Sequence, residues 1–286
     1  MNYRHAFHAG NFADVLKHAI LARVITYMMR KPQPFRVIDT HAGAGRYDLT
    51  GAAAGKTGEW QDGIGRLLAY QLTDRAAELL RPYLASVAAL NPDVDGEALH
   101  YYPGSPLVAR HIMRRDDQLV ANELHPDDGR LLAREFHRAA STKVLSLDAW
   151  IAVKSLLPPK ERRGLILIDP PFERADEFDS LTKAMLDALS RFETGTYVIW
   201  YPIKDRSKAD TFVAEITKRP HIKYLDVRLA VARPFAGLGL TQCGVLVINP
   251  PYTLRSELEE LMPVVVTALA IDGGAGFDLQ SEWQAR

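Results

Sequence analysis

Apolar residues follow two different periods along this 286-residue chain, and the alternation between them predicts the fold class. Residues 11–30 carry valine, leucine, isoleucine and alanine at helical spacing, and the prolines of 31–34 end that pattern. Short apolar runs typical of buried strands then alternate with stretches of helical character. This order predicts an α/β fold with a mainly parallel sheet and helices on both of its faces.

Strands are expected at seven apolar runs: 35–38, 118–122, 143–147, 165–168, 197–200, 224–231 and 244–248. Helices are expected between most of them, for example at 126–139, 177–191 and 206–219. Residues 232–242, between the last two runs, are few, contain glycine and show no helical pattern. We therefore expect the last two strands to pair antiparallel, as a hairpin at the edge of the sheet.

Residues 48–100 interrupt this alternation. They contain two helix-like runs, 62–70 and 73–90, but no convincing strand. We predict an inserted helical subdomain at 48–100, and a Rossmann-like main domain formed by 1–47 and 101–286. A lid that becomes ordered only around a ligand is the alternative, and the many leucines and alanines of the interval disfavour it.

Charge and cysteine content narrow the class of protein. The chain has 35 basic and 35 acidic residues, so a nucleic-acid partner would need a local basic patch. Cys243 is the single cysteine, which excludes an internal disulfide and any cysteine-rich metal site. No apolar run is long enough for a membrane span, and the N-terminus does not resemble a signal peptide. We expect a cytoplasmic protein.

The most distinctive chemistry follows the apolar run that ends at residue 168. Asp169, Pro170, Pro171 and Phe172 come directly after it, and we call these four residues the hook. Neither proline has an N–H and each fixes its own φ, so we expect the hook to be rigid and extended. The Asp169 carboxylate and the prolyl carbonyls suit the exocyclic amino group of a planar base, while Phe172 stacks on its ring. A stiff turn without a ligand is the alternative for such a motif in isolation.

A pair of glycines, Gly43 and Gly45, follows the first strand and lets the backbone approach a ligand closely. Asp39 and His41 also follow the first strand, and single acids follow the next three strands along the chain: Glu123, Asp148 and Asp169. Parallel strands end at one edge of a sheet, so these side chains are expected to converge on one crevice. A lone acid at a strand end is more often a helix cap, but this combination favours a binding site.

The crevice suits a nucleoside ligand. Glu123 suits ribose hydroxyls, and Asp148 suits the exocyclic amine of a purine. The glycine pair lacks the third glycine of the dinucleotide fingerprint, and Glu123 lies far beyond the usual distance from it. The proposed insertion accounts for that distance. The pattern resembles Rossmann-like methyltransferases that bind S-adenosylmethionine more than it resembles nicotinamide enzymes.

Over nearly its full length the chain resembles a known family, the bacterial 23S ribosomal RNA adenine-N6 methyltransferases of the J type (RlmJ). Seven strings carry the resemblance: YRHAFHAGN at 3–11, DVLKH at 14–18, DTHAGAGRY at 39–47, YYPGSP at 101–106, ELHP at 123–126, RRGLILIDPP at 162–171 and INPP at 248–251. Strings of this length are far more specific than the hook alone.

The resemblance implies methyl transfer from S-adenosylmethionine, without a metal, to the N6 of an unpaired or flipped-out adenine, adenine 2030 of 23S rRNA. It implies neither a membrane nor an obligate protein partner. Asp169 matches the catalytic acceptor of the family. The cofactor-binding set, with the glycine pair included, is Lys17, His18, His41, Gly43, Gly45, Ser105, Glu123, Asp148, Ala149 and Asp169.

Substrate contacts are expected from the hook and from the segment before the first helix. By resemblance Tyr3 is a substrate contact, and Arg4, His5 and His8 join it in a basic and aromatic leader suited to RNA. Pro170 and Phe172 complete this set. A metal site at His5 and His8 is disfavoured, because no carboxylate or thiol cluster accompanies them.

Two positions depart from the family pattern. Phe172 stands where tyrosine is more frequent, which keeps the stacking face but removes a hydroxyl. Ala149 stands where glycine is usual, a change that a backbone contact should tolerate. Three basic pairs, Arg114-Arg115, Arg162-Arg163 and Lys218-Arg219, either contact phosphates or remain solvated.

Three other functions compete with this interpretation. An adenine-N6 methyltransferase acting on DNA or another RNA shares the hook, although the DNA enzymes normally carry a sequence-reading domain that we do not find. A glutamine-N5 protein methyltransferase usually has asparagine in place of Asp169. A non-catalytic RNA-binding assembly factor would not need Gly43, Gly45, Glu123 and Asp169 together.

Overall fold

A single eight-stranded sheet forms the centre of the computed structural model, which describes residues 4–92, 99–234 and 239–282. Its strand order is β10-β8-β9-β7-β6-β1-β4-β5. The strands are β1 (Arg36–Asp39), β4 (Gln118–Asn122), β5 (Thr142–Leu145), β6 (Gly164–Ile168), β7 (Thr196–Pro202), β8 (Tyr224–Ala230), β9 (Gln242–Ile248) and β10 (Gly276–Gln280).

The parallel half of the sheet brings the predicted strand ends together. Strand β1 pairs in parallel with β4 on one side and with β6 on the other, and β5 and β7 extend the two sides. From β1 the chain moves outward to β4 and β5, then returns to β6 and continues to β7. Strand order therefore reverses between β1 and β6, the position at which open α/β sheets bind their ligands.

The antiparallel half of the sheet contains one error of the sequence analysis. Strands β8 and β9 pair antiparallel, as predicted, but they are not the edge of the sheet. Strand β9 lies between β7 and β8, and the unpredicted β10 covers the free side of β8. Strand β10 has five residues, begins with a glycine and has no buried position, so its sequence resembles a surface loop.

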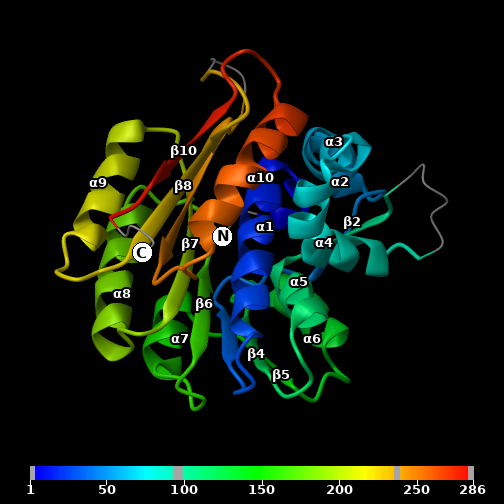
Figure 1. Ribbon diagram of the computed structural model, residues 1–286. Helices are drawn as coiled ribbons and strands as arrows, with labels where there is room; N and C mark the ends of the chain where they lie inside the picture. The colour runs from blue at the N-terminus through cyan, green and yellow to red at the C-terminus, as the bar shows by residue number, and fades with distance from the viewer. Residues whose placement is uncertain (1–3, 93–98, 235–238, 283–286) are drawn as a thin grey trace.

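Helices cover both faces of the sheet, and the residue alternation of the strands explains why. In β6, Ile166 and Ile168 belong to one core, whereas Leu165 and Leu167 belong to the core on the opposite face. The first core is covered by α7 (Ala149–Leu156), α8 (Glu177–Arg191) and α9 (Arg206–Thr217). The second includes α1 (Phe12–Met28), α5 (Ser105–Ile112) and α10 (Leu254–Leu269), and Figure 1 shows the two groups on opposite sides. Helix α6 (Pro126–Glu135) follows β4 and contributes to this second core.

The described part of the interval 48–100 is helical. It contains α2 (Ala52–Thr57), the irregular helical turn η2 (Gln61–Gly65), α3 (Arg66–Ala69) and α4 (Asp74–Ala89). Strands β2 (Arg46–Asp48) and β3 (Tyr101–Pro103) come before and after these helices in the chain and pair antiparallel in a separate two-stranded sheet. These helices gather beside α1, α5 and α10 and share their core (Figure 1). The division into a main domain and an inserted subdomain stays a prediction.

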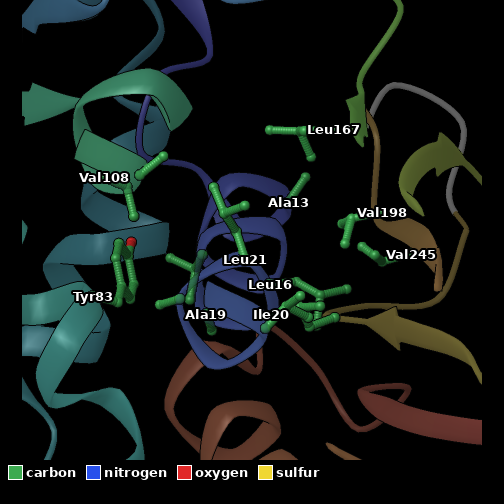
Figure 2. Close-up of a cluster of buried hydrophobic side chains, with 14 of the residues drawn as sticks. Ala13, Leu16, Ala19, Ile20, Leu21, Tyr83, Val108, Leu167, Val198 and Val245 are labelled. Atoms are coloured by element: carbon green, nitrogen blue, oxygen red, sulfur yellow. The ribbon is translucent and has the colours of Figure 1, made fainter. Parts of the chain in front are cut away.

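Helix α1 is buried on all sides. Fifteen of its 17 residues are buried, so it lacks the polar face of a surface helix. Figure 2 shows what surrounds it: Tyr83 and Val108 lie on one side, and Leu167, Val198 and Val245 lie on the other. The helix therefore joins the sheet to the helices of residues 50–92. No helix in the part of the chain that the structure describes is long and apolar enough to cross a membrane.

Two arginines of the basic pairs, Arg114 and Arg163, have partners within the fold. Arg114 binds Asp117 and the carbonyls of residues 31–33, and Arg163 binds the carbonyls of Met28 and Gln33. Both guanidinium groups also lie over the ring of Phe35. These contacts fasten the loop before β1 at the amino ends of the strands, opposite the ligand-binding edge of the sheet. Arg114 and Arg163 are therefore bound by the protein itself, and contact of the basic pairs with phosphates stays a prediction.

Because α1 is packed between the sheet and the helices of residues 50–92, deleting side-chain volume from it should be costly. Ile20 is fully buried, and Ile20→Ala should lower the free energy of unfolding by about 2–5 kcal/mol, measured by urea denaturation. Ile151, which is 60% exposed on α7, provides the control: Ile151→Ala should change stability by no more than about 0.5 kcal/mol. Equal losses for the two variants would contradict the central position of α1.

Candidate active site

Two cavities meet at the hook. The smaller one, of about 340 Å³, lies at the carboxyl ends of β1, β4, β5 and β6. The larger one, of about 750 Å³, lies between the leader, the hook and the end of β7. Five residues line both cavities: His5, Lys17, Asp169, Pro170 and Pro171. Groups bound in the two cavities would therefore meet beside Asp169.

The glycine loop and Glu123 form one wall of the smaller cavity. Gly43 has a φ of +61°, and a Cβ at this position would lie 2.0 Å from the Tyr47 hydroxyl oxygen. Its N–H donates to Glu123 Oε2 at 2.8 Å, while the N–H of His125 donates to Oε1 at 2.7 Å. Burial raises the pKa of Glu123, and these two backbone bonds oppose that effect. Glu123 is thus fixed in place beside a backbone that only glycine permits.

Asp39 lies behind this wall, at the end of β1. The side chain is 1% exposed, and the Ser105 hydroxyl donates to its Oδ2 at 2.6 Å. Burial raises its pKa to about 7, although the Ser105 hydrogen bond and the charge of Lys17 lower it. Ser105 itself lines the smaller cavity. Asp39 therefore changes its charge near neutral pH, next to the predicted cofactor site.

Asp148 lines the same cavity and also caps a helix. Its Oδ1 accepts from the N–H groups of Trp150 and Ile151, at the start of α7. The residue is exposed, so a capping role and a ligand role are compatible. Ala149 follows it and lines the cavity too. The His41 ring lies 5.7 Å from that of Trp150, and burial lowers the pKa of His41 to about 4, so it is neutral.

Lys17 connects α1 to the hook. Its ammonium donates to Asp14 Oδ1 at 2.7 Å and to Asp169 Oδ2 at 2.5 Å. Burial opposes its charge, but the two carboxylates outweigh burial and raise the pKa of Lys17 well above its ordinary value. The sequence analysis placed Lys17 beside the cofactor. It does line the smaller cavity, yet its charge is already bound by two acids.

Three residues of the predicted set lie outside the lining of both cavities. The His18 side chain is fully buried, with Nδ1 2.8 Å from the Tyr102 hydroxyl oxygen, and burial lowers its pKa to about 3. Gly45 has a φ of +81° and shapes the glycine loop. Arg4 binds Asp128 at 3.1 Å. Tyr3 lies outside the described residues.

The leader closes over the hook through polar contacts with three elements. It includes the short helical turn η1 (His5–Phe7). His5 Nε2 lies 2.9 Å from Asp14 Oδ2 on α1, and His8 Nδ1 lies 2.9 Å from Glu59 Oε1 near η2. The hydrogen bond to Glu59 raises the pKa of His8. Arg4 reaches α6 through Asp128. Both histidines line the larger cavity.

The hook is not extended through its last residue, which corrects the sequence-based expectation. Phe172 has a φ of +49°, in the left-handed region that residues with a Cβ rarely adopt. This turn carries the ring to Phe178, at a centroid distance of 4.8 Å, and to Trp200, at 5.9 Å. Phe172 and Trp200 both line the larger cavity. Packing of the ring into an aromatic cluster accounts for the strained backbone.

Sequence reasoning missed three residues that line the larger cavity: Asp14, Trp200 and Lys204. Asp14 had a detectable signal, because Asp14 and Lys17 are opposite charges three residues apart on a helix whose first half is otherwise apolar except for His18. Trp200 lies in β7 and Lys204 follows it, and the neighbours of this strand could not be read from the chain. Among the described residues, no cluster of three or more His, Cys, Asp or Glu side chains could hold a metal ion.

The strand order, the cavity at the point where it reverses, the glycine loop and the hook together define a Rossmann-like methyltransferase. A family model described as "Ribosomal RNA large subunit methyltransferase D, RlmJ" matches residues 32–284. The chain belongs to this RlmJ family of methyltransferases.

Individual relatives agree with this assignment. Proteins named ribosomal RNA large subunit methyltransferase J are 39% identical in Haemophilus influenzae and 40% identical in Escherichia coli. The alignments cover 99% and 96% of this chain, and 98% and 96% of the two relatives. The crystal structure of protein LPL1258 from Legionella pneumophila has a TM-score of 0.86 at 34% identity, over 96% of this chain and 98% of that one.

The raised pKa of Asp39 predicts a measurable dependence of stability on pH. The folded protein keeps this proton up to about pH 7, whereas the ordinary pKa is 3.8, so stability should fall as pH rises between these values. Asp39→Asn removes the titration, so its free energy of unfolding should fall less than that of the wild type between about pH 5 and 8. Asp179→Asn, at an exposed position on α8, is the control. Parallel urea-denaturation profiles for all three proteins would refute the assignment.

Proposed function

We propose that this chain transfers a methyl group from S-adenosylmethionine to the exocyclic N6 of an unpaired adenine in 23S ribosomal RNA. The observation that carries the proposal is the position of Asp169 and Pro170, which line the smaller and the larger cavity at once. The names of the relatives support large-subunit ribosomal RNA as the substrate. Adenine 2030 is the target nucleotide that the family resemblance favours.

The smaller cavity fits the cofactor. The backbone of Gly43 lines it without a side chain, and two carboxylates, Glu123 and Asp148, line it as well. Each oxygen of Glu123 accepts one backbone bond and retains a lone pair for ribose hydroxyls. Bound S-adenosylmethionine would supply a methyl group on a positively charged sulfur, an electrophile strong enough that the proposal includes no metal. His41, Ser105 and Ala149 line the remaining surface.

The larger cavity fits a nucleotide base. Phe172, Trp200 and Pro202 supply apolar and aromatic surface, and His5 and His8 lie at the leader side. Stacking of a base on an aromatic ring is worth roughly 1–3 kcal/mol. A paired adenine hides its N6 in the duplex, so the target must be unpaired or flipped out to enter.

Asp169 has two tasks in this proposal. The N6 lone pair is delocalised into the purine ring, and hydrogen bonds from the amino group to Asp169 and to the Pro170 carbonyl favour a pyramidal, nucleophilic nitrogen. Orientation of two reactants can lower a barrier by up to about 7–11 kcal/mol. As the nitrogen becomes cationic, the Asp169 carboxylate receives one of its protons. The rigid prolines hold both acceptors in place.

The first test addresses the cofactor site. Glu123→Ala should weaken S-adenosylmethionine binding by about 1–3 kcal/mol, the scale of a lost hydrogen bond to a charged group, measured by calorimetry. Glu135→Ala removes a carboxylate that pairs with Arg46 and lines neither cavity, so it should bind the cofactor normally. Unchanged affinity in folded Glu123→Ala would remove this residue from the site.

The second test addresses catalysis. Asp169→Ala and Asp169→Asn should each slow single-turnover methylation by at least about 10²-fold, because both lose the proton acceptor. The alanine variant should be the slower, because it also lacks an oxygen that can accept a hydrogen bond from N6. Phe172→Tyr should stay close to the wild-type rate, whereas Phe172→Ala should be slower because the aromatic surface is lost. The assay follows labelled methyl groups from S-adenosylmethionine into 23S rRNA prepared from a strain that lacks the enzyme.

The same assay separates the competing functions. Parallel reactions with DNA and with protein acceptors should remain unlabelled, and nuclease digestion of the labelled RNA should yield N6-methyladenosine. Transfer to DNA or protein in preference to RNA would overturn the substrate assignment. Wild-type turnover by Asp169→Ala would show that Asp169 only ends its strand.

A further inference from the structure

Asp14 lies at the base of the larger cavity, in the first turn of α1, and is 2% exposed. Both of its oxygens are occupied by the protein. Oδ1 binds the Lys17 ammonium at 2.7 Å, and Oδ2 accepts from the Gly10 N–H at 2.9 Å and lies 2.9 Å from His5 Nε2. The Asn11 side chain caps the helix by accepting from the N–H groups of Ala13 and Asp14. Asp14 is thus held in place by Lys17, Gly10 and His5.

Lys17 links Asp14 to Asp169 of the hook. Its side chain is 5% exposed, and it bridges Asp14 and Asp169, at 2.7 and 2.5 Å respectively. A lysine side chain has several rotatable bonds, so one ion pair alone would leave its ammonium free to move with Asp169. The second pair, with a carboxylate on the same helix, fixes the ammonium relative to α1. The location of the Asp169 carboxylate is therefore tied to the core helix.

Asp14 also determines the charge available for proton transfer. The three groups together carry one net negative charge, so a proton accepted by Asp169 leaves a neutral cluster. Without Asp14, Lys17 and Asp169 would be neutral as a pair, and the same proton would leave an uncompensated buried ammonium. Burying an unpaired charge is strongly unfavourable. Proton uptake at Asp169 is therefore easier with Asp14 present.

We propose that Asp14 is a positioning residue that acts through Lys17: it fixes the Asp169 carboxylate where the two cavities meet and keeps the cluster able to accept a proton. This inference rests on the proposed methyl transfer, in which Asp169 orients N6 and takes its proton.

Removal of the Asp14 charge should be visible in the titration of Lys17. The raised pKa of Lys17 comes from two carboxylates acting against burial, so Asp14→Asn leaves a buried ammonium with a single partner, and its pKa should fall. Other titratable groups that interact with Asp14 or Lys17 come from the leader, α1, β1 and the loop after it, β2, α4, β3, the hook and β9. They are His5, His8, His18, Asp39, His41, Tyr47, Tyr83, Tyr102, Asp169 and Cys243. The two carboxylates among them, Asp39 and Asp169, are retained in the variant.

The test compares the wild type with Asp14→Asn in two measurements. Single-turnover methylation of 23S rRNA at saturating cofactor should slow by roughly 10- to 100-fold, the scale for loss of an orienting partner. Its decline at alkaline pH should begin at least about one pH unit lower than in the wild type. In the ligand-free protein, ¹⁵N NMR of lysine side chains should show the Lys17 ammonium losing its proton at correspondingly lower pH.

Asp226→Asn is the matched control. Asp226 is also fully buried and paired, with Tyr201 and Arg228, but it lines neither cavity. This substitution should lower stability without moving the alkaline limb of the rate profile. A merely structural role for Asp14 predicts the same behaviour for Asp14→Asn, namely a slower or less stable enzyme with an unshifted limb, and that result would overturn the proposal.

A comparison of two further variants covers the case in which Asp14→Asn alone does not fold. The pair Lys17→Met and Asp14→Asn/Lys17→Met removes first one and then both charges of the buried pair, which proteins often tolerate. If Asp14 acts only through Lys17, these two variants should methylate RNA at similar rates. A much slower double variant would contradict the proposal. Absence of RNA methylation by the wild type would instead refute the proposed function, while the NMR titration would still test the link to Lys17.

Discussion

Complete burial of α1 is the constraint on which the rest of this structure depends. A helix enclosed by the sheet on one side and by α4 and α5 on the other cannot leave a charged group unpaired. Its charged residues accordingly have specific partners: Arg23 binds Glu257, and Lys17 binds Asp14 and Asp169. The first pair ties α1 to α10, and the second ties it to the hook. Helix α10 and the Asp169 carboxylate are thus both fixed to α1.

This arrangement places a single strand end at the border of two cavities. The hook leaves β6 at the place where strand order reverses, so the same short segment borders the cavity over β1, β4 and β5 and the cavity beside β7. The prolines make the hook rigid, and Lys17 of α1 forms an ion pair with Asp169. The proposed reaction needs both, because it joins two reactants at one carboxylate.

Much of the fold could be predicted from local patterns. The parallel strands and α8 lie where apolar runs and helical spacing predicted them, because buried strands and amphipathic helices carry their signal in a few consecutive residues. Strand β10 and the central position of β9 could not be predicted, since both depend on which distant strand supplies a partner. The site could be predicted in part for the same reason. The acids that follow β4, β5 and β6 line the smaller cavity, as expected, whereas the places of Asp14 and Trp200 in the larger cavity depend on how distant elements pack.

The sequence by itself determined the class of fold, the family and the chemical groups at the strand ends, because each is carried by short runs of consecutive residues. Tertiary structure alone decided how those groups are used. It packed the Phe172 ring into an aromatic cluster, buried His18 of α1 against Tyr102 and bound Lys17 to two acids. Each outcome depends on residues that are distant in the chain and close in space. A buried charge among them is stable only when it is paired with an opposite charge or a hydrogen-bond partner.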